Sequence, residues 1–527
     1  MRKLLLVDGQ LVCRNPNCRI CAIAKEPEWI AIHTDCYHLY RSCAKLSESK
    51  ARDLLFMIAS WRNPWTGAEP MYLDPGINQA ELIKISEKFQ FPHLRKLPIE
   101  LLDMIRKEQP HVFFWRFQFV ISLSPSIKLP QSPLQKKPID DIFTWKRGEF
   151  PKPGPFIPLP PLVRLTIDVH GIQSIQRLHK QPEYDGYTYK NLSFIVEHMT
   201  NLSDITVEFK GNCFARLCQS HRKTALPIWN TSSPPPLSFC YFIKSAVLNS
   251  GAFSRLCIND LQRCRGITFF ISKGKLFGVY NHKTEDSCAA DAYKRISISD
   301  YDQKCMVWVY VPIAQEDKLI SLGYCPGAEF KQFNLSGQMQ MEYGGKVIVG
   351  LSKDKFVHLG SGMPTALLYD EPRENEPITM FGAYIPSPYD LAPLSLQVPV
   401  KKEPRNYFSW APLGGIESTN VFYHTHTQLC AGIVFQYHNR GSRAIGQCRL
   451  GVDRSMIVLE PRILCFQNFD RGVQVKVGTD DTHEHGDEWE CLSLDDDGAI
   501  AFSFNYDSSY MYFTRELYMV ADPAIDK

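Results

Sequence analysis

Cysteine and histidine pairs near the start of the chain have the spacing of metal ligands. Cys18-x2-Cys21 is followed, after an eleven-residue spacer, by His33-x2-Cys36. Tetrahedral zinc is bound by such pairs, because thiolate and imidazole ligands a few residues apart can converge on one ion. A site with four protein ligands is closed to water and is therefore structural rather than catalytic. We predict a structural zinc ion in a small Cys/His head over residues 1–45.

The ligand set of this predicted site has alternatives. Cys13 or Cys43 could replace one of the four ligands, and His38 could compete with His33. A further alternative is that the cysteines of this segment are incidental and bind no metal. Residues 1–45 offer little apolar periodicity from which to build a core, so something other than side-chain packing must hold this segment. A bound metal ion would supply that stabilisation.

Two further histidine pairs have an alternating spacing. His424-Thr-His426 and His483-Glu-His485 would each place both imidazoles on one face of a strand, where a metal is conceivable. The second pair lies in the polar, acidic segment GTDDTHEHGDEWE, and we interpret it as a solvated loop. Most other cysteines are scattered singly through apolar segments, and we interpret these as small buried hydrophobes. Examples are Cys240, Cys257, Cys325, Cys448 and Cys465.

Motifs of two common enzyme classes are missing from the sequence. Gly344-Gly345-Lys346 lacks both the upstream glycine spacing and the following Ser or Thr of a phosphate-binding loop. No G-x-S-x-G sequence occurs either. We therefore expect a protein without enzymatic activity. Its seventeen cysteines, an odd number without a secretory signal, favour reduced thiols and a cytoplasmic or nuclear location.

The segments after the head carry the apolar period of helices. SESKARDLLFMIASW begins with capping serines and has apolar residues at i, i+1, i+4 and i+7 from Leu54, which predicts a helix. A second helix is predicted over 78–89. A third begins at Pro98, which is favoured in a first turn, and Glu100 complements the N-terminal end of the helix dipole. The segment HVFFWRFQFV follows, and it is too aromatic to be exposed to solvent, so we expect it to pack against another part of the chain or a partner. We assign residues 46–123 to a helical region.

The third of these helices, within about 91–123, resembles the F-box. In that family a leucine precedes Leu-Pro-x-Glu, and hydrophobic residues line the helix that follows. The resemblance implies that this helix binds the Skp-type linker protein of a cullin-RING ubiquitin ligase, while a separate domain holds a protein client. The alternative is an ordinary core helix that begins with Leu-Pro-x-Glu. The matching positions are Leu94, Leu97, Pro98, Glu100, Leu101 and Ile105.

The wider order of motifs resembles a group of large filamentous-fungal F-box-like proteins. The likeness runs through most of the chain and implies a Cys/His head, an F-box-like region and a β-rich C-terminal body. The segments that carry it are WIAIHTDC, the Leu-Pro-x-Glu helix, LPIWNTSSPPP, CRGITFFISKGKLFG and GIVFQYHNRGSRAIGQC.

Prolines recur every few residues over 124–160, which favours extended backbone and predicts an interdomain linker. Beyond it, apolar and polar residues alternate with the period of half-buried strands. A segment from Cys264 resembles a segment from Cys430, so we predict two related β-rich units at 161–330 and 331–527. The expected fold class is therefore α+β multidomain, with a large, mainly β body.

Charge and hydropathy limit the class of partner. The chain has 59 Lys and Arg against 56 Asp and Glu, a balance that indicates neither a nucleic acid nor an anionic membrane surface. Its longest uncharged apolar run, 306–313, is too short to span a bilayer as a helix. We expect a ubiquitin-ligase adaptor, with an intracellular sugar- or peptide-binding module as the alternative. An adaptor needs part of the Leu97, Leu101 and Ile105 face exposed, whereas a capping helix buries it.

Overall fold

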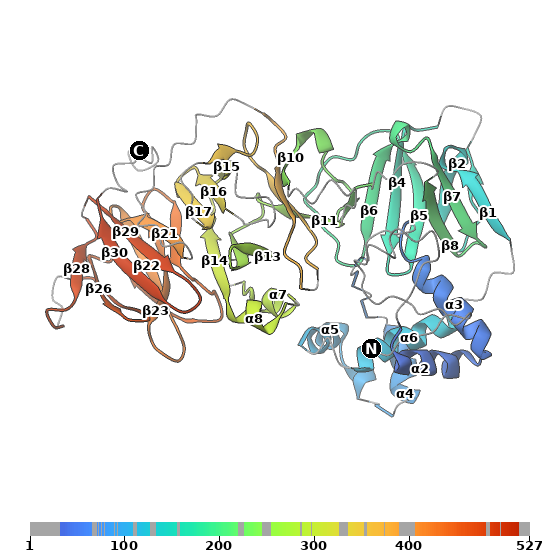
Figure 1. Ribbon diagram of the computed structural model, residues 1–527, viewed down its shortest axis with the longest axis horizontal. Helices are drawn as coiled ribbons and strands as arrows, with labels where there is room; N and C mark the ends of the chain where they lie inside the picture. The colour runs from blue at the N-terminus through green and yellow to red at the C-terminus, as the bar shows by residue number, and fades with distance from the viewer. Residues whose placement is uncertain are drawn as a thin grey trace. The chain divides into compact units, whose positions relative to one another are not determined.

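The computed structural model is mainly β, with its longer helices placed before the first strands (Figure 1). The chain forms two compact units. The first lies within Met1–Pro234 and Ser250–Leu256, and the second within Pro235–Asn249 and Cys257–Lys527. The structure describes residues 32–65, 71, 73–74, 76–77, 79–88, 90–91, 93–108, 113–126, 133–154, 159–219, 226–244, 255–284, 287–296, 298–325, 336–351, 356–373, 375–388, 406–480, 485–495 and 497–515.

Helices of the first unit form where the apolar period predicts them. α3 (Glu48–Ser60) follows a serine at its N-cap position, and α4 (Gln79–Lys88) occupies the second predicted helix. α5 (Ile99–Glu108) is the Leu-Pro-x-Glu helix, and α6 (Phe113–Ser126) is formed by the aromatic segment after it. α2 (Thr34–Ala44) precedes them, within the predicted Cys/His head.

The first unit also contains two β-sheets. One has the strand order β1-β7-β8. The other runs β9-β6-β4-β5-β2-β3 and continues past β9 to β11 (Arg255–Asp260), whose first two residues pair in parallel with β9. The other neighbouring strands are antiparallel: Leu165 of β4 pairs with Ile175 of β5 on one side and with Ile195 of β6 on the other. The bounds are β1 Leu134–Pro138, β2 Ile142–Lys146, β3 Lys152–Pro153, β4 Leu162–Asp168, β5 Gly171–Leu178, β6 Ser193–His198, β7 Ile205–Lys210, β8 Phe214–Gln219 and β9 Ile228–Trp229.

Side chains from both sheets meet in one core, so the sheets form a sandwich. Trp145 of β2 and Phe209 of β7 are each 1% exposed, and their ring centroids lie 5.4 Å apart. Ala215 and Leu217 of β8 face the same core. Because successive strand residues point to opposite faces, the residues between them on β8 are available to a further layer.

The helices supply that further layer. Tyr40 of α2 and Leu54 of α3 are buried in one apolar cluster with Trp61 and Phe214. The Trp61 and Phe214 rings meet edge-on with centroids 6.4 Å apart, and the Arg216 guanidinium lies 4.8 Å from the Trp61 ring centroid. The helical layer therefore rests on the face of β8 that points away from the sandwich core.

Strands β1, β2 and β3 lie within 124–160, where the sequence predicts a proline-rich linker. Ile142 and Trp145 from this range are buried in the sandwich core. Pro153 fits because it ends the two-residue strand β3, the last strand of its sheet, where a missing N–H removes no bond between central strands. Over residues 133–154 the structure thus differs from the linker prediction, since the segment belongs to the fold.

The second unit is built from several sheets. Their orders are β10-β20-β19-β11, β13-β12-β14, β17-β16-β15-β18, β21-β29-β30 and β25-β22-β23-β27-β26-β28, with β24 also pairing β23. Two short helices, α7 (Ala290–Lys294) and α8 (Asp300–Lys304), connect β13 to β14. The bounds are β10 Cys240–Lys244, β11 Arg255–Asp260, β12 Gly266–Ser272, β13 Lys275–His282, β14 Met306–Pro312, β15 Leu319–Tyr324, β16 Ser336–Met341, β17 Lys346–Gly350, β18 Val357–His358, β19 Ala366–Asp370, β20 Met380–Tyr384, β21 Tyr407–Pro412, β22 Ile416–Tyr423, β23 Cys430–Tyr437, β24 Ser442–Gly446, β25 Arg454–Leu459, β26 Ile463–Phe469, β27 Gly472–Gly478, β28 Glu490–Ser493, β29 Ala499–Phe504 and β30 Ser509–Thr514.

One apolar cluster connects most of these sheets. It contains Ile267 of β12, Ile433 of β23 and Phe502 of β29, and all three side chains are fully buried. Residues on both sides of the boundary predicted between 330 and 331 therefore share a core. The two compact units divide near Pro234 instead.

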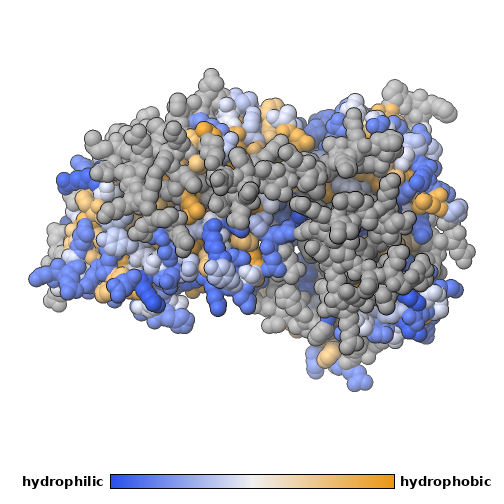
Figure 2. All heavy atoms as spheres, in the orientation of Figure 1, coloured by the Kyte–Doolittle hydropathy of each residue, from blue (hydrophilic) through white to orange (hydrophobic). Residues whose placement is uncertain are grey.

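On the face drawn in Figure 2, hydrophilic residues cover much of the described surface, and hydrophobic residues are scattered among them. None of the described helices is both long and apolar enough to cross a bilayer. The longest of them, α6, has 14 residues, whereas a spanning helix needs about 20.

Candidate functional site

A 3-10 turn, η1 (Leu94–Lys96), precedes helix α5, with Leu97 and Pro98 between them. The Leu97 N–H donates to the Leu94 carbonyl at 3.3 Å and closes this turn. Pro98 follows, at a position where its missing N–H removes no helix bond. The Leu102 N–H then donates to the Pro98 carbonyl at 3.2 Å, which makes the first full turn of α5. The Leu-Pro-x-Glu sequence thus fixes where the helix starts.

α5 has a buried side and an exposed apolar side. Leu102 is fully buried, whereas Leu101, Met104 and Ile105 are 44%, 59% and 43% exposed. Residues three and four apart are neighbours on a helix surface, so these three side chains lie on one side of α5. Leu101, Met104 and Ile105 are called the α5 apolar face below. Contiguous exposed apolar side chains commonly mark an interaction site.

The structure places the predicted adaptor-binding residues at the start of α5 and along its apolar face. The predicted set omits Met104, the most exposed residue of that face, because the family pattern does not single it out. The four exposed members of the set are Pro98, Glu100, Leu101 and Ile105, and the two half-buried members are Leu94 and Leu97.

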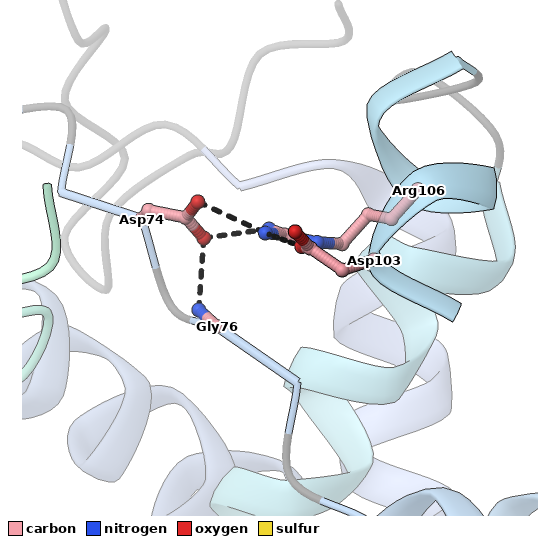
Figure 3. Close-up of polar contacts among 4 residues, drawn as sticks. All are labelled: Asp74, Gly76, Asp103 and Arg106. Carbon is pink, nitrogen blue, oxygen red and sulfur yellow. Dashed lines mark hydrogen bonds and ion pairs between the residues drawn. The ribbon is translucent and has the colours of Figure 1, made fainter. Parts of the chain in front are cut away.

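An ion-pair cluster holds another side of α5 (Figure 3). Arg106 donates to both carboxylate oxygens of Asp74, at 2.6 and 2.9 Å, and to Asp103 at 2.8 Å. The Asp74 carboxylate also accepts the Gly76 N–H at 2.8 Å. Hydrogen bonds between charged partners are shorter and stronger than neutral ones, and a bidentate pair also fixes the orientation of the guanidinium. The cluster therefore ties α5 to the segment around Asp74.

Both members of the main pair are charged at neutral pH. Burial raises the pKa of the Asp74 carboxyl, but the hydrogen bonds from Arg106 and Gly76 and the Arg106 charge outweigh it, so the pKa lies below its usual value. The hydrogen bond to Asp74 raises the pKa of Arg106. Leu102 and Arg106 are four residues apart and share one side of the helix. That anchored side is separate from the α5 apolar face.

The aromatic side chains of α6 pack, as the sequence requires. Phe119 lies against the apolar cluster of α2 and α3, and its ring stacks on the His170 imidazole with centroids 5.9 Å apart. Phe114 meets the rings of Phe91 and Trp115 edge-on, with centroids 6.2 and 4.9 Å away. α6 is thus part of the helical layer.

Two of the four predicted zinc ligands lie in the described part of the head. His33 is exposed at the N-cap position of α2, and Cys36 is buried in the first turn of that helix. Burial raises the pKa of the Cys36 thiol, so zinc would have to displace its proton. Cys18 and Cys21 lie outside the described residues, and the predicted site stays a prediction.

A different Cys/His group occurs in the second unit. The ligand atoms of Cys465, His485 and Cys491 all lie within 4.8 Å of one another, and the group could hold a metal ion. Cys465 is on β26, Cys491 is on β28, and His485 precedes β28. No second cluster of this kind is found among the residues that the structure describes. His424 and His426 lie beyond the end of β22, in a turn rather than on a strand face.

Sequence patterns miss this group because its members belong to different elements. From the sequence, Cys465 is interpreted as a small buried hydrophobe and His485 as part of a solvated loop, and Cys491 is not singled out. The two cysteines meet only through the pairing of β26 with β28, and strand register is not visible in a single sequence. The one local signal is Cys491, which directly follows the histidine-rich segment, six residues after His485.

Comparison with known proteins adds no assignment. No protein-family model matches the chain, and no curated protein matches it. The functional argument therefore rests on the geometry of the two units themselves.

Proposed function

We propose that this protein is an F-box-type substrate adaptor, in which the α5 apolar face binds a Skp-type linker protein of a cullin ubiquitin ligase. The observation that carries the proposal is the exposure of Leu101, Met104 and Ile105, between 43% and 59%, on an anchored helix. A helix that only caps a core buries its large apolar side chains, because burying each one fully contributes about 1.5–3 kcal/mol.

Contacts on a neighbouring side of α5 hold the helix in place, so that its exposed apolar face can bind a partner. Leu102 and the Arg106–Asp74 pair hold α5 in place, so its apolar face is presented on a fixed support. Pro98 and Glu100 are exposed as well, and a partner can therefore contact the whole start of the helix. An apolar centre with a polar rim is the usual composition of a protein–protein interface.

The remaining parts have supporting roles in this proposal. The β-rich units hold an unknown protein client, since loops on rigid sheets commonly supply binding residues. Zinc bound by Cys18, Cys21, His33 and Cys36 would stabilise the head. The adaptor would act in the cytoplasm or nucleus and would itself catalyse no reaction. The alternative is an intracellular sugar- or peptide-binding module without a ubiquitin role, which follows if the α5 apolar face binds no linker.

Co-purification of the full chain with a Skp-type linker tests the proposal. The double change Leu101→Ala, Ile105→Ala removes most of the α5 apolar face. Each of these side chains, once buried at an interface, could supply ~1–3 kcal/mol, so their joint loss should weaken linker binding by at least about 30-fold. The melting temperature should fall much less than it would for two core residues, because these two residues are 44% and 43% exposed in the free protein.

Strand β25 offers a matched control. Ile457 and Leu459 are aliphatic residues of the second unit with 64% and 68% exposure. Changing both to alanine removes a similar apolar area and should leave linker binding unchanged. The adaptor function would be ruled out, and the binding module left, if the linker never co-purifies with the wild type. Equal capture by the wild type and the Leu101→Ala, Ile105→Ala variant would exclude the α5 apolar face as the contact.

A further inference from the structure

Strands β26 and β28 place two thiols side by side. Cys465 and Cys491 are directly opposite one another in this antiparallel pair, and so are their neighbours Leu464 and Leu492. Both leucines belong to the buried core of the second unit. Because successive strand residues point to opposite faces, the two cysteines point to the other face of the sheet.

The segment before β28 brings an imidazole to this pair. His485 Nε2 lies 3.0 Å from Cys491 Sγ. His485 Nδ1 lies 3.2 Å from the Gly486 carbonyl oxygen, to which its N–H can donate a hydrogen bond, and this arrangement leaves Nε2 as the nitrogen that faces the thiols. The Trp489 ring stacks on the imidazole with centroids 5.3 Å apart and 24° between the ring planes. Backbone and indole thus both orient His485.

We propose that Cys465, His485 and Cys491 bind a divalent transition-metal ion, with zinc as the natural occupant. Two thiolates and one imidazole favour zinc over magnesium or calcium, which prefer oxygen ligands. Around tetrahedral zinc, with bonds of about 2.3 Å to sulfur and about 2.0 Å to nitrogen, sulfur atoms lie about 3.8 Å apart and sulfur lies about 3.6 Å from nitrogen. The three ligand atoms already lie within 4.8 Å of one another, so small side-chain movements of about 1 Å bring them into this geometry.

The competing explanation is a simple hydrogen bond between the Cys491 thiol and the His485 imidazole. It accounts for the 3.0 Å contact, and Cys491 also interacts with the Cys465 thiol opposite it, but such pairwise contacts leave the two sulfur atoms and the nitrogen without a common partner. A metal ion uses all three residues and links the outermost strand of the sheet, β28, to β26 and to the preceding segment. Three protein ligands leave the fourth tetrahedral position to water or an external ligand.

Metal content of the full chain tests this site, with Co²⁺ as the probe because its thiolate complexes absorb light. The protein is stripped with a chelator under reducing conditions, loaded with Co²⁺ and desalted. His485→Gln and Cys491→Ser should each hold one ion per chain fewer than the wild type and lose part of the thiolate-to-cobalt absorption. His485 is half-buried outside the strands, so its variant should fold even if the cysteine variant does not.

Cys218→Ser is the matched control, because Cys218 is a half-buried strand cysteine of the first unit. It should hold as much Co²⁺ as the wild type. The comparison counts ions as a difference from the wild type, so any ion in the head cancels and the result does not depend on adaptor function. Unchanged Co²⁺ content and absorption in folded His485→Gln and Cys491→Ser, with folding verified by circular dichroism, would overturn the proposal.

Discussion

Arg106 donates hydrogen bonds to both carboxylate oxygens of Asp74, at 2.6 and 2.9 Å, and so joins α5 to a residue 32 positions before Arg106 in the chain. The two side chains are 16% and 33% exposed, so water screens their attraction less than it screens a fully exposed pair. Together with the buried Leu102, the pair fixes one side of α5 while Leu101 and Ile105 remain exposed.

Replacing Arg106 with Gln should destabilise the first unit by about 1–3 kcal/mol, because Asp74 loses two charge-assisted hydrogen bonds while it stays partly buried. Arg95→Gln is the control. Arg95 pairs with Glu87 at 3.8 Å, between side chains that are 48% and 61% exposed, and its loss should change stability by less than about 1 kcal/mol. Denaturant unfolding measures both variants, and equal effects would contradict the anchoring role.

The Arg106–Asp74 pair should also weaken in acid. The pKa of Asp74 lies below its usual value in the fold, so the unfolded carboxyl takes up a proton at a higher pH than the folded one. The stabilisation is therefore complete above the unfolded pKa of about 3.9 and is lost as the pH falls through the lowered folded pKa. The stability difference between the wild type and Arg106→Gln should shrink below about pH 4. A difference that stays constant down to the acid transition would exclude this linkage.

Gly171 lies where the helical layer meets the β-sandwich. Its φ is +101°, and a Cβ there would come within 2.2 Å of the Trp61 carbonyl oxygen. Gly148 is a matched control, since its φ is +94° but nothing lies within 4 Å of a Cβ at that position. Gly148→Ala should show backbone strain alone, about 1–2 kcal/mol. Gly171→Ala should destabilise the fold by a further ~1–3 kcal/mol, because the added Cβ also clashes with the Trp61 carbonyl oxygen. Equal melting temperatures would contradict the close approach.

His282 is buried between polar partners of its own unit. Its Nε2 lies 2.8 Å from Thr268 Oγ1, and its Nδ1 lies 2.7 Å from the Ser287 carbonyl oxygen. Burial lowers the pKa of His282 to about 4. As the pH falls from about 6.5 to about 4, the unfolded imidazole binds a proton and the folded one does not, so stability should fall by up to about 3 kcal/mol.

The variant His282→Gln should lack this pH dependence, so its stability relative to the wild type should improve between pH 7 and about pH 4. His179 is exposed and provides the control. His179→Gln should follow the wild type across the same range in denaturant unfolding experiments. A His282→Gln variant that also follows the wild type would show that the folded imidazole is protonated like the unfolded one.

Local periodicity was sufficient to predict several elements. α3 follows from its apolar spacing after the serine at the N-cap position, α5 from Leu-Pro-x-Glu, and β4 (Leu162–Asp168) from alternating residues, because each signal is contained in one short segment. The exposure of Leu101 and Ile105 could not be predicted in this way. An amphipathic stripe has the same pattern whether it covers a core or awaits a partner.

Long-range pairing was the part that the sequence did not reveal. β1 and β2 lie in a proline-rich range, and only their packing on distant residues such as Phe209 explains why Trp145 is buried there. Cys465 and Cys491 likewise meet through the register of two strands, so neither residue carries a local sign of the other. Spacing motifs detect cysteines and histidines that are close in sequence, and these two cysteines are far apart in it.

A calorimetric titration of the full chain with a purified Skp-type linker protein measures the proposed contact itself. The adaptor proposal predicts saturable binding with a Kd of about 1 μM or tighter, equivalent to about 8 kcal/mol. Binding should weaken at least about 30-fold in Leu101→Ala, Ile105→Ala and stay unchanged in Ile457→Ala, Leu459→Ala. No detectable binding of the wild-type chain, or the same Kd for the wild type and the α5 variant, would contradict the proposal.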